Sequence, residues 1–303
     1  MILIMPYFGT WPEWFELFLE TCRWNASIHW EFFTDCEIPD SPPENVRFTK
    51  ITFAEYCDRV SHALGIRFAP QHPYKLCDIR PMLGHVHQLE IARYDYFGYG
   101  DIDVFYGDIR RIYNEDLLNR GYACISSSAE MVSGHFALFR TCQKTIEAYK
   151  KIPGWQTLAA QPSHQCVDEN HQSRIYLPSS LSFPLNKISH WAQPLKGASY
   201  FREQYTTPFI DKPWIDGSFL HPDLWTWKEG RLTNNRDRGR EFLYLHFMNF
   251  RSARYLPTYR GSQACWASLE RVNWVTKEQM GEGWTVGPDG IRPFQELQAA
   301  QPG

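Results

Sequence analysis

Three features are missing from this sequence of 303 residues. No apolar run approaches the roughly 18 to 20 residues of a membrane-spanning helix, which argues against an integral membrane protein. The eight cysteines include no C-x-x-C pair, so neither a zinc ribbon nor a disulfide framework is expected. Neither sign of charge is in excess, because 31 Lys and Arg against 34 Asp and Glu leave a formal charge of −3, and nucleic acid is therefore not an expected partner.

The amino-terminal segment also lacks the marks of a secretory signal. Met1 to Pro6 contains no basic residue, and its apolar stretch breaks at Pro6. We therefore expect reduced thiols and a cytoplasmic location, with at most a peripheral contact at the inner face of the cell membrane. The basic turn Arg236 to Arg240 is the candidate for that contact, although a solvated loop is the usual explanation of such a turn.

Aromatic residues are what the sequence has in surplus, with 12 Trp, 16 Tyr and 20 Phe. At 43% hydrophobic and 21% charged residues, the chain can bury a substantial core. The aromatic side chains either fill that core or stack on sugar rings or bases, and composition leaves both open. Trp225 and Trp227 are two residues apart, so in a strand they would project from the same face. They could stack on an acceptor sugar or belong to the core.

The opening residues predict an α/β fold. Ile2 to Tyr7 is expected to form a strand, Thr10 to Glu13 has capping-box spacing for a helix, and Ile28 to Thr34 is expected to form a second strand. A β-α-β unit implies parallel strands. It brings Pro6 to Gly9 and Asp35 to the carboxyl edge of the sheet, where open α/β folds bind ligands.

Later segments extend this pattern. We expect strands over 46–50, 123–126, 136–139 and 242–247, and helices over 53–64 and 81–91. The run over 96–105 is aromatic and β-prone, and two acids interrupt it where the strand should stop. Thr52 to Glu55 offers a capping box for the first of these helices. Many prolines beyond residue 150 predict a loop-rich carboxyl-terminal half, and the last 20 or so residues are expected to be a poorly ordered tail.

Asp101 and Asp103 follow a hydrophobic, β-prone run. If the strand continues through them, their side chains project to the same side and the two carboxylates converge. Such acids repel each other unless a cation lies between them. Mg²⁺ or Mn²⁺ suits oxygen ligands and can bind a diphosphate. The ion then offsets the negative charge that develops on the diphosphate when it departs as the leaving group. A D-x-D triplet alone fits two solvated turn acids equally well.

Residues far from the acidic pair add to this interpretation. A basic and acidic cluster precedes the predicted helix at 81–91: Lys75, Asp78 and Arg80. A helix amino terminus favours phosphates. His246 ends an apolar strand, and imidazole beside an acidic pair is an ordinary Mn²⁺ ligand, although a lone histidine after a strand is more often structural. Arg251 and Arg254 follow and can hold phosphate oxygens in a bidentate manner.

Taken in order, these motifs resemble the GT-A nucleotide-sugar glycosyltransferases, in particular a bacterial group from capsule and lipopolysaccharide gene clusters. The resemblance covers the opening strand and nucleotide loop (Ile4 to Phe15), a donor-binding segment (Lys75 to Pro81), the D-x-D strand (Phe97 to Gly107), a sugar-pocket segment (Ser133 to Arg140), an acidic motif near the acceptor (Val167 to Asn170) and a metal-binding histidine (His246). It implies a Rossmann-like GT-A domain over 1–255, with a mixed, mainly parallel sheet flanked by helices. Residues 256–303 would form an extension that packs on this domain and ends in a flexible tail.

The resemblance also implies roles for single residues. Asp103 and His246 would bind the metal directly, and Asp101 would be shared between the metal and the donor. The other donor-binding positions would be Pro6, Tyr7 and Asp35 at the uracil and ribose, Lys75, Asp78 and Arg80 at the sugar and its phosphates, and Gly134 and His135 in the sugar pocket. The family often places Gly and Lys after the histidine; here Arg251 or Arg254 would replace that Lys.

Asp168 and Glu169 are catalytic candidates for a chemical reason as well. A glycosyl acceptor needs either a base for its hydroxyl group or a donor whose oxocarbenium-like transition state is stabilised. A carboxylate can serve either purpose, although a solvated acidic turn is an equally good interpretation of the pair.

The predicted function is the transfer of a hexose from a UDP-sugar, with Mn²⁺ or Mg²⁺, to a growing bacterial surface polysaccharide or a lipid-linked glycan. The resemblance of His246 to the metal-binding histidine of retaining families favours retention of configuration. Two alternatives stay open. One is a haloacid-dehalogenase-like phosphohydrolase that uses Asp101 and Asp103, although that motif normally lies on the first strand. The other is a non-catalytic carbohydrate-binding protein with an aromatic platform.

Overall fold

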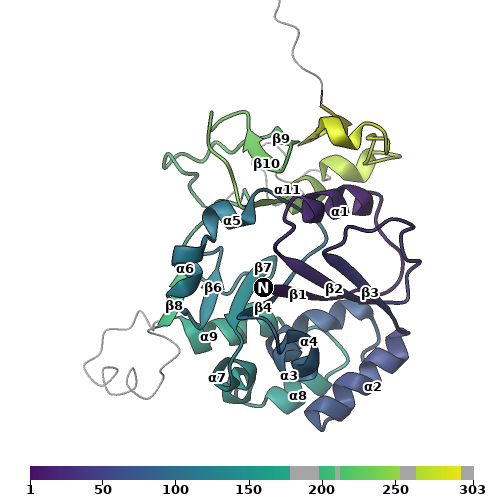
Figure 1. The fold of residues 1–303 in the computed structure, drawn as a ribbon, viewed down its shortest axis with the longest axis vertical. Helices are drawn as coiled ribbons and strands as arrows, with labels where there is room; N and C mark the ends of the chain where they lie inside the picture. Colours follow the sequence, from purple (N-terminus) through teal and green to yellow (C-terminus); the bar gives the residue numbers. More distant parts are fainter. Residues whose placement is uncertain (178–197, 209–211, 253–263, 295–303) are drawn as a thin grey trace, which may run out of the picture. The chain divides into compact units, whose positions relative to one another are not determined.

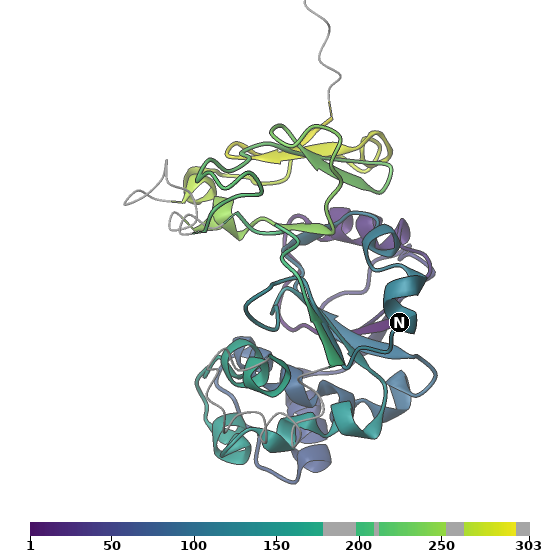
Figure 2. The same ribbon diagram turned by 90° about the vertical axis from the view of Figure 1, so that its left-hand side faces the viewer.

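The computed structural model describes residues 1–177, 198–208, 212–252 and 264–294 (Figures 1 and 2). The chain divides into two compact units. Unit 1 comprises Met1–Trp11, Ala26–Asp101 and Tyr113–Gln204, and unit 2 comprises Pro12–Asn25, Ile102–Ile112 and Tyr205–Gly303. The chain passes between the units five times, and none of these points is the boundary expected at residue 255. The domain assignment from the sequence therefore stays a prediction.

Unit 1 contains a seven-stranded mixed sheet (Figure 1). Its order is β3 (Val46–Lys50), β2 (His29–Thr34), β1 (Ile2–Pro6), β4 (Tyr96–Gly100), β7 (Phe136–Arg140), β6 (Cys124–Ser126) and β8 (Ser199–Phe201). The first four strands pair in parallel, β7 runs antiparallel to β4 and β6, and β6 pairs in parallel with β8. The expected mixed, mainly parallel α/β sheet is confirmed.

The central strands form where the sequence is continuously apolar. Ile2, Leu3, Ile4 and Met5 of β1 are all buried, because β1 lies between β2 and β4. A strand that is buried on both faces needs apolar residues at every position rather than at alternate ones. This explains why the bounds of β1 were readable from the sequence.

The helix α2 (Phe53–Leu64) begins and ends as its sequence predicts. The Thr52 hydroxyl accepts a hydrogen bond from the Glu55 N–H at 3.2 Å, and the Glu55 carboxylate accepts one from the Thr52 N–H at 2.9 Å. This capping box satisfies two otherwise unpaired donors. Gly65 ends the helix with a φ of 64°, in the left-handed region that favours glycine.

The single helix expected over 81–91 is wrong. The chain instead forms a 3₁₀ helix η1 (Pro73–Met82), α3 (Leu83–Val86) and α4 (Gln88–Ile91). The break falls at His87, whose φ of −119° and ψ of 36° are not helical. The His87 ring is buried and pairs with the Tyr56 hydroxyl at 2.9 Å, so a long-range contact overrides the local helical pattern.

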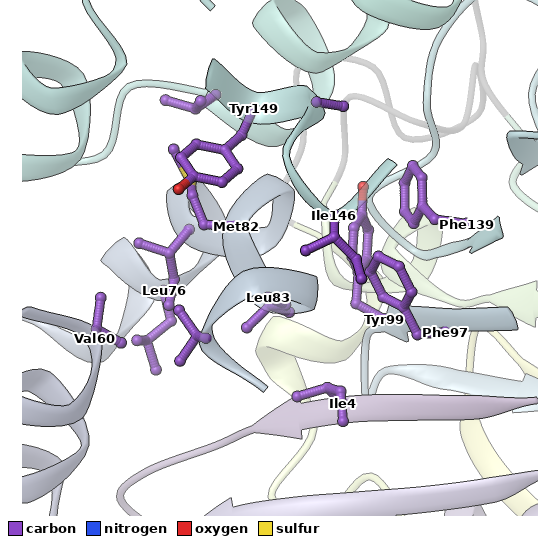
Figure 3. Close-up of a cluster of buried hydrophobic side chains, with 14 of the residues drawn as sticks. Ile4, Val60, Leu76, Met82, Leu83, Phe97, Tyr99, Phe139, Ile146 and Tyr149 are labelled. Atoms are coloured by element: carbon purple, nitrogen blue, oxygen red, sulfur yellow. The ribbon is translucent and has the colours of Figure 1, made fainter. Parts of the chain in front are cut away.

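Short helices complete unit 1: α6 (Glu115–Asn119), α7 (Gln143–Ile146), η2 (Ala148–Lys151), α8 (Trp155–Ala160), η3 (Val167–His171) and α9 (Gln172–Tyr176). Figure 3 shows the core that several of them share with the sheet. Ile4, Phe97 and Phe139 point from β1, β4 and β7 toward Leu83 of α3 and Ile146 of α7. This packing fixes η1 and β4, which carry the residues of the site.

Unit 2 is built from short elements around two small sheets. They are α1 (Phe15–Arg23), β5 (Val104–Tyr106), α5 (Ile109–Ile112), β9 (Trp225–Lys228), β10 (Arg231–Asn234), β11 (Tyr244–His246), α11 (Met248–Arg251), η7 (Cys265–Ser268), η8 (Met280–Glu282), β12 (Trp284–Gly287) and β13 (Gly290–Pro293). One sheet has the order β10-β9-β12-β13, with all pairs antiparallel, and the other pairs β11 with β5.

Tryptophan side chains fill the core of unit 2. Trp225 and Trp227 are 0% and 1% exposed, and Trp227 stacks on Trp284 with ring centroids 4.0 Å apart. The Trp227 indole N–H donates to the Tyr106 carbonyl at 2.8 Å, which satisfies its polar group. These two tryptophans belong to the core and are not placed to stack on an acceptor sugar.

Two local expectations from the sequence are wrong. The capping box expected at Thr10 to Glu13 does not form, since α1 begins after Trp14, which makes no side-chain capping bond. The Glu13 carboxylate instead accepts a hydrogen bond from the Val272 N–H at 2.9 Å. The expectation of a poorly ordered tail is also wrong for the described residues up to 294. There β12 and β13 form a hairpin, with Gly290 at a φ of 100°.

Candidate functional site

Four chain segments of unit 1 meet around the Arg80 guanidinium. Arg80 lies in η1, Asp101 follows the end of β4, and Asp168 lies in η3. Arg80 forms an ion pair with Asp101, a second with Asp168 at 3.1 Å, and a hydrogen bond to the Gly134 carbonyl at 3.0 Å. The exposed fractions of the Arg80 and Asp168 side chains are 13% and 6%, so these charge-assisted contacts are only partly screened by solvent.

Glu169 adds a third carboxylate to this cluster. Burial raises the pKa of Glu169, and the nearby charges of Asp168 and Asp101 raise it further. Burial also raises the pKa of Asp168, although Arg80 opposes the shift. The charges of Asp101 and Asp168 hold the pKa of Arg80 well above its ordinary value against the effect of burial. Three acids around one guanidinium leave a negative cluster that suits a cation or a developing positive charge.

The acidic pair lies on unusual backbone. η3 is a π-helix, and it begins after Cys166, a non-glycine residue with a φ of 53°. Short π-helical turns occur frequently at functional sites, and a side chain at positive φ persists only when its surroundings hold it there. The turn is held by Ser173, whose hydroxyl donates to the Glu169 carbonyl and accepts from the Val132 N–H at 2.8 Å.

Gly134 lies close to two side chains of the cluster. A Cβ at this position would lie 2.8 Å from Glu169 Oε1 and 3.2 Å from Arg80 Nη1. The backbone carbonyl of the next residue, His135, accepts a hydrogen bond from the Asp101 N–H at 3.1 Å. One imidazole nitrogen of His135 and one carboxylate oxygen of Asp101 also lie within 4.8 Å of each other. The structure therefore brings the predicted sugar-pocket residues to the acidic cluster.

Lys75 and Asp78 form a buried ion pair beside this cluster. Lys75 Nζ lies 2.8 Å from Asp78 Oδ2, and the two side chains are 1% and 0% exposed. Lys75 also donates to the carbonyls of Leu158 and Ser163, at 2.7 and 2.9 Å. Asp78 accepts from the Val167 N–H at 2.9 Å, among other backbone donors. The pair thus holds the segment that leads into η3. Direct contact of these residues with a nucleotide-sugar donor stays a prediction.

A metal ion is not needed at Asp78. His164, Asp78 and Asp168 offer ligand atoms within 4.8 Å of one another. The Lys75 ammonium group already supplies a cation there, at hydrogen-bond distance from Asp78. We therefore assign this group a structural role.

A second set of predicted residues lies at the carboxyl ends of β1 and β2. The Gly9 N–H donates to the Asp35 carboxylate at 2.8 Å, and Gly9 has a φ of 114°. Pro6 ends β1, and the Tyr7 ring that follows stacks on Trp11 at a centroid distance of 4.9 Å. The strand ends thus carry an exposed carboxylate beside an aromatic pair. Trp11 was missed by the sequence reasoning, which considered Tyr7 alone.

Unit 2 holds Asp103, His246 and Arg251 together. His246 pairs with Val104 in the antiparallel β5–β11 ladder, which puts its side chain beside Asp103. His246 Nε2 lies 3.5 Å from Asp103 Oδ1, and Arg251 Nη1 lies 2.6 Å from Asp103 Oδ2. The Arg251 guanidinium also lies over the Trp14 ring, 5.2 Å from its centroid. Three of the predicted residues thus share one site.

The donor set of this site fits a divalent metal ion. His246 Nδ1 lies 3.3 Å from the Thr207 hydroxyl, which leaves Nε2 directed at the carboxylate. A bond to the second ring nitrogen is the usual way in which proteins orient a metal-binding histidine. Imidazole and carboxylate together suit Mn²⁺. Thr207 carries no sequence signal for this role, since it lies 39 residues before His246.

The geometric premise of the D-x-D interpretation needs correction. β4 ends at Gly100 and β5 begins at Val104, so neither acid lies in a strand and the alternation of side chains does not apply to them. Asp101 ends a segment of unit 1, whereas Asp103 belongs to unit 2, and each has its own cationic partner. Arg254, the alternative to Arg251, lies outside the described residues.

Fold and site together describe a mixed α/β protein with two groups of charged side chains: three carboxylates around Arg80, and Asp103 with His246 and Arg251. The chain belongs to a family of unknown function, DUF6625, whose model matches residues 3–269. A search of the curated proteins finds no match to the sequence. Within the described ranges, no helix is long and apolar enough to cross a membrane.

Proposed function

We propose that this protein is a metal-dependent glycosyltransferase of the GT-A type, which transfers a hexose from a UDP-sugar to a bacterial surface glycan or its lipid-linked precursor. The observation that carries the proposal is the group of Asp103, His246 and Arg251 in unit 2, where ligands for a metal lie next to a cation suited to a diphosphate. The parallel strands β1 to β4, followed by the reversed β7, support the GT-A assignment.

Asp103 and His246 would hold the metal, and the sequence predicts Asp101 as a further ligand. When bound, the metal offsets the charge that develops on the leaving UDP. Arg251 would release Asp103 and bind the diphosphate oxygens instead. Its side chain is flexible and 43% exposed, so the guanidinium group can move between the two partners. Thr207 keeps the imidazole oriented throughout.

The Arg80 cluster would receive the donor sugar and the acceptor. Asp168 and Glu169 are poised to stabilise positive charge at the reacting carbon or to accept the proton of the acceptor hydroxyl. Burial raises the pKa of both carboxylates, which makes each a stronger base than an exposed acid, and the Arg80 guanidinium opposes the shift at both. Tyr7, Trp11 and Asp35 would flank the uracil and ribose.

The observed contacts favour transfer over the alternatives from the sequence. A phosphohydrolase of the haloacid-dehalogenase type normally carries its aspartate pair at the first strand, whereas Asp101 and Asp103 follow β4, the fourth strand along the chain. An aromatic sugar platform is not supplied by Trp225 and Trp227, which are buried. Retention of configuration remains the favoured outcome on the resemblance of His246 alone.

The experiment is calorimetric titration of the protein with UDP, with and without Mn²⁺. We expect Mn²⁺-dependent binding to the wild type, loss of binding in Asp103→Ala, and unchanged binding in Asp58→Ala. Asp58 is an exposed acid of α2 and serves as the matched control. Equal binding in EDTA, or full binding by Asp103→Ala, would remove the metal from the proposed mechanism. No binding of UDP under any condition would exclude a UDP-sugar donor.

A further inference from the structure

An apolar loop of unit 2 exposes three large side chains just before β9. The exposed fractions are 55% for Phe219, 65% for Leu220 and 42% for Leu224. Single exposed apolar residues are ordinary on protein surfaces. Three of them within six residues of one loop form an apolar surface of the kind that binds a partner or a membrane.

The loop is anchored at its base. Trp214 is 3% exposed, and its indole N–H donates to the Asp237 carboxylate at 2.7 Å. The Trp214 N–H donates to the Ser218 carbonyl at 2.7 Å, and the Gly217 N–H donates to the Trp214 carbonyl at 2.9 Å. A buried ring and a closed turn therefore hold the residues that immediately precede Phe219. The apolar side chains are presented outward by an ordered loop.

A basic turn lies against this loop. Arg236 donates to the Asp216 carboxylate at 2.5 Å and to the Ser218 hydroxyl at 3.0 Å. The Asn235 N–H donates to the Leu224 carbonyl at 3.0 Å. These bonds join the turn to both ends of the exposed apolar stretch.

The next two basic residues of the turn, Arg238 and Arg240, are exposed. Neither forms an ion pair with a carboxylate in the described ranges, whereas the nearby acids Asp216, Asp223 and Asp237 all accept hydrogen bonds within the loop and turn. Arg240 lies over the rings of Tyr205 and Phe242, at 5.6 and 5.4 Å from their centroids. Within the described ranges, Arg238 and Arg240 therefore carry guanidinium groups without an ion-pair partner, and they belong to the turn that is hydrogen-bonded to both ends of the apolar stretch.

We propose that this surface, formed by Phe219, Leu220, Leu224, Arg238 and Arg240, docks on an anionic lipid membrane. Apolar side chains next to cations match the boundary where acyl chains meet phosphate headgroups. A purely apolar protein partner would leave the two guanidinium groups without counter-charges. The inference rests on unit 2 alone and does not depend on glycosyl transfer.

The test is co-sedimentation of the full chain with vesicles of phosphatidylcholine, with and without phosphatidylglycerol. We expect binding to the anionic vesicles that falls as salt is raised. The double variant Phe219→Ser/Leu220→Ser should bind at least tenfold more weakly, and Arg238→Gln/Arg240→Gln should lose the preference for anionic lipid. The control is Leu89→Ser, because Leu89 of unit 1 is 89% exposed and lies outside this surface.

Three results would overturn the proposal. They are no binding of the wild type to anionic vesicles, wild-type binding by Phe219→Ser/Leu220→Ser, and an equal loss in Leu89→Ser. Sedimentation of the same samples without lipid addresses self-association. A dimer of the wild type that dissociates in Phe219→Ser/Leu220→Ser, without vesicle binding, would assign the surface to a second copy of the chain. Because UDP binding is measured separately, failure here leaves the proposed reaction standing.

Discussion

Replacing Lys75 by Met tests the role of the buried ion pair beside the acidic cluster. The change keeps most of the apolar volume of the side chain and removes its ammonium group. Asp78 would then retain a negative charge at 0% exposure without its cationic partner, and the carbonyls of Leu158 and Ser163 would lose their donor. Removing one partner of a buried pair costs about 3–5 kcal/mol, because the other charge stays buried and uncompensated.

The double variant Lys75→Met/Asp78→Asn separates the charge from the packing. It removes the uncompensated charge, so it should recover part of the lost stability even though it carries one more substitution. The chain also offers a matched control. Lys150 and Glu147 have the same three-residue spacing and the same 2.8 Å separation, but their side chains are 47% and 36% exposed. Lys150→Met should therefore leave the stability unchanged within error.

Urea unfolding followed by circular dichroism measures these differences. We expect Lys75→Met to lower the free energy of unfolding by about 3–5 kcal/mol. We also expect it to weaken activity, since the segment that enters η3 loses its anchor. A loss below about 1 kcal/mol, or equal losses in Lys75→Met and Lys150→Met, would refute the reasoning that burial makes this pair structural.

Three further predictions concern single residues of the site. Gly134→Ala should destabilise the protein by about 1–3 kcal/mol and reduce transfer, because the new Cβ displaces Glu169 and Arg80. The control is Gly281→Ala, which has no atom near its Cβ position and should change neither stability nor transfer. Thermal unfolding and turnover assays measure the two effects. Glu169→Gln should raise the midpoint of thermal unfolding at pH 7 by roughly 2–4 °C. The folded-state pKa of Glu169 is raised, so ionisation of Glu169 destabilises the wild type as pH rises above the pKa of the unfolded state. The stability advantage of Glu169→Gln over the wild type should therefore shrink toward pH 4. A difference in stability that stays constant across pH would contradict this explanation. Thr207→Val should weaken Mn²⁺ binding about 10- to 100-fold without unfolding the protein, because His246 loses the group that orients its ring, and unchanged affinity would deny Thr207 that role.

The parts of the fold that followed from the sequence are those set by local patterns. The apolar run of β1, the β-prone segments of β2 and β3 and the capping box of α2 depend on neighbouring residues only, and all of them appear where expected. The helix over 81–91 failed because the break at His87 depends on Tyr56, which is 31 residues away in the sequence. The hairpin of β12 and β13 was missed because its core partner, Trp227, lies far upstream.

The same distinction holds for the candidate site. The order of motifs identified Arg80, Asp168 and Glu169, and the structure brings them together in unit 1. Their burial could not be predicted, because it depends on the depth of η1 and η3 in the fold. For the same reason, the spacing of Lys75 and Asp78 indicated a charged cluster without indicating that each residue is saturated by backbone groups.

The central claim is that Asp103 and His246 hold a divalent metal ion. Electron paramagnetic resonance measures it directly, because the signal of free Mn²⁺ falls as the ion binds. We predict one Mn²⁺ site in the wild type that weakens at least tenfold in His246→Ala and in Asp103→Ala. Binding should be unchanged in His62→Ala, an exposed histidine of α2. Equal Mn²⁺ affinity in the wild type and His246→Ala, or no bound Mn²⁺ in the wild type with UDP present, would contradict the account.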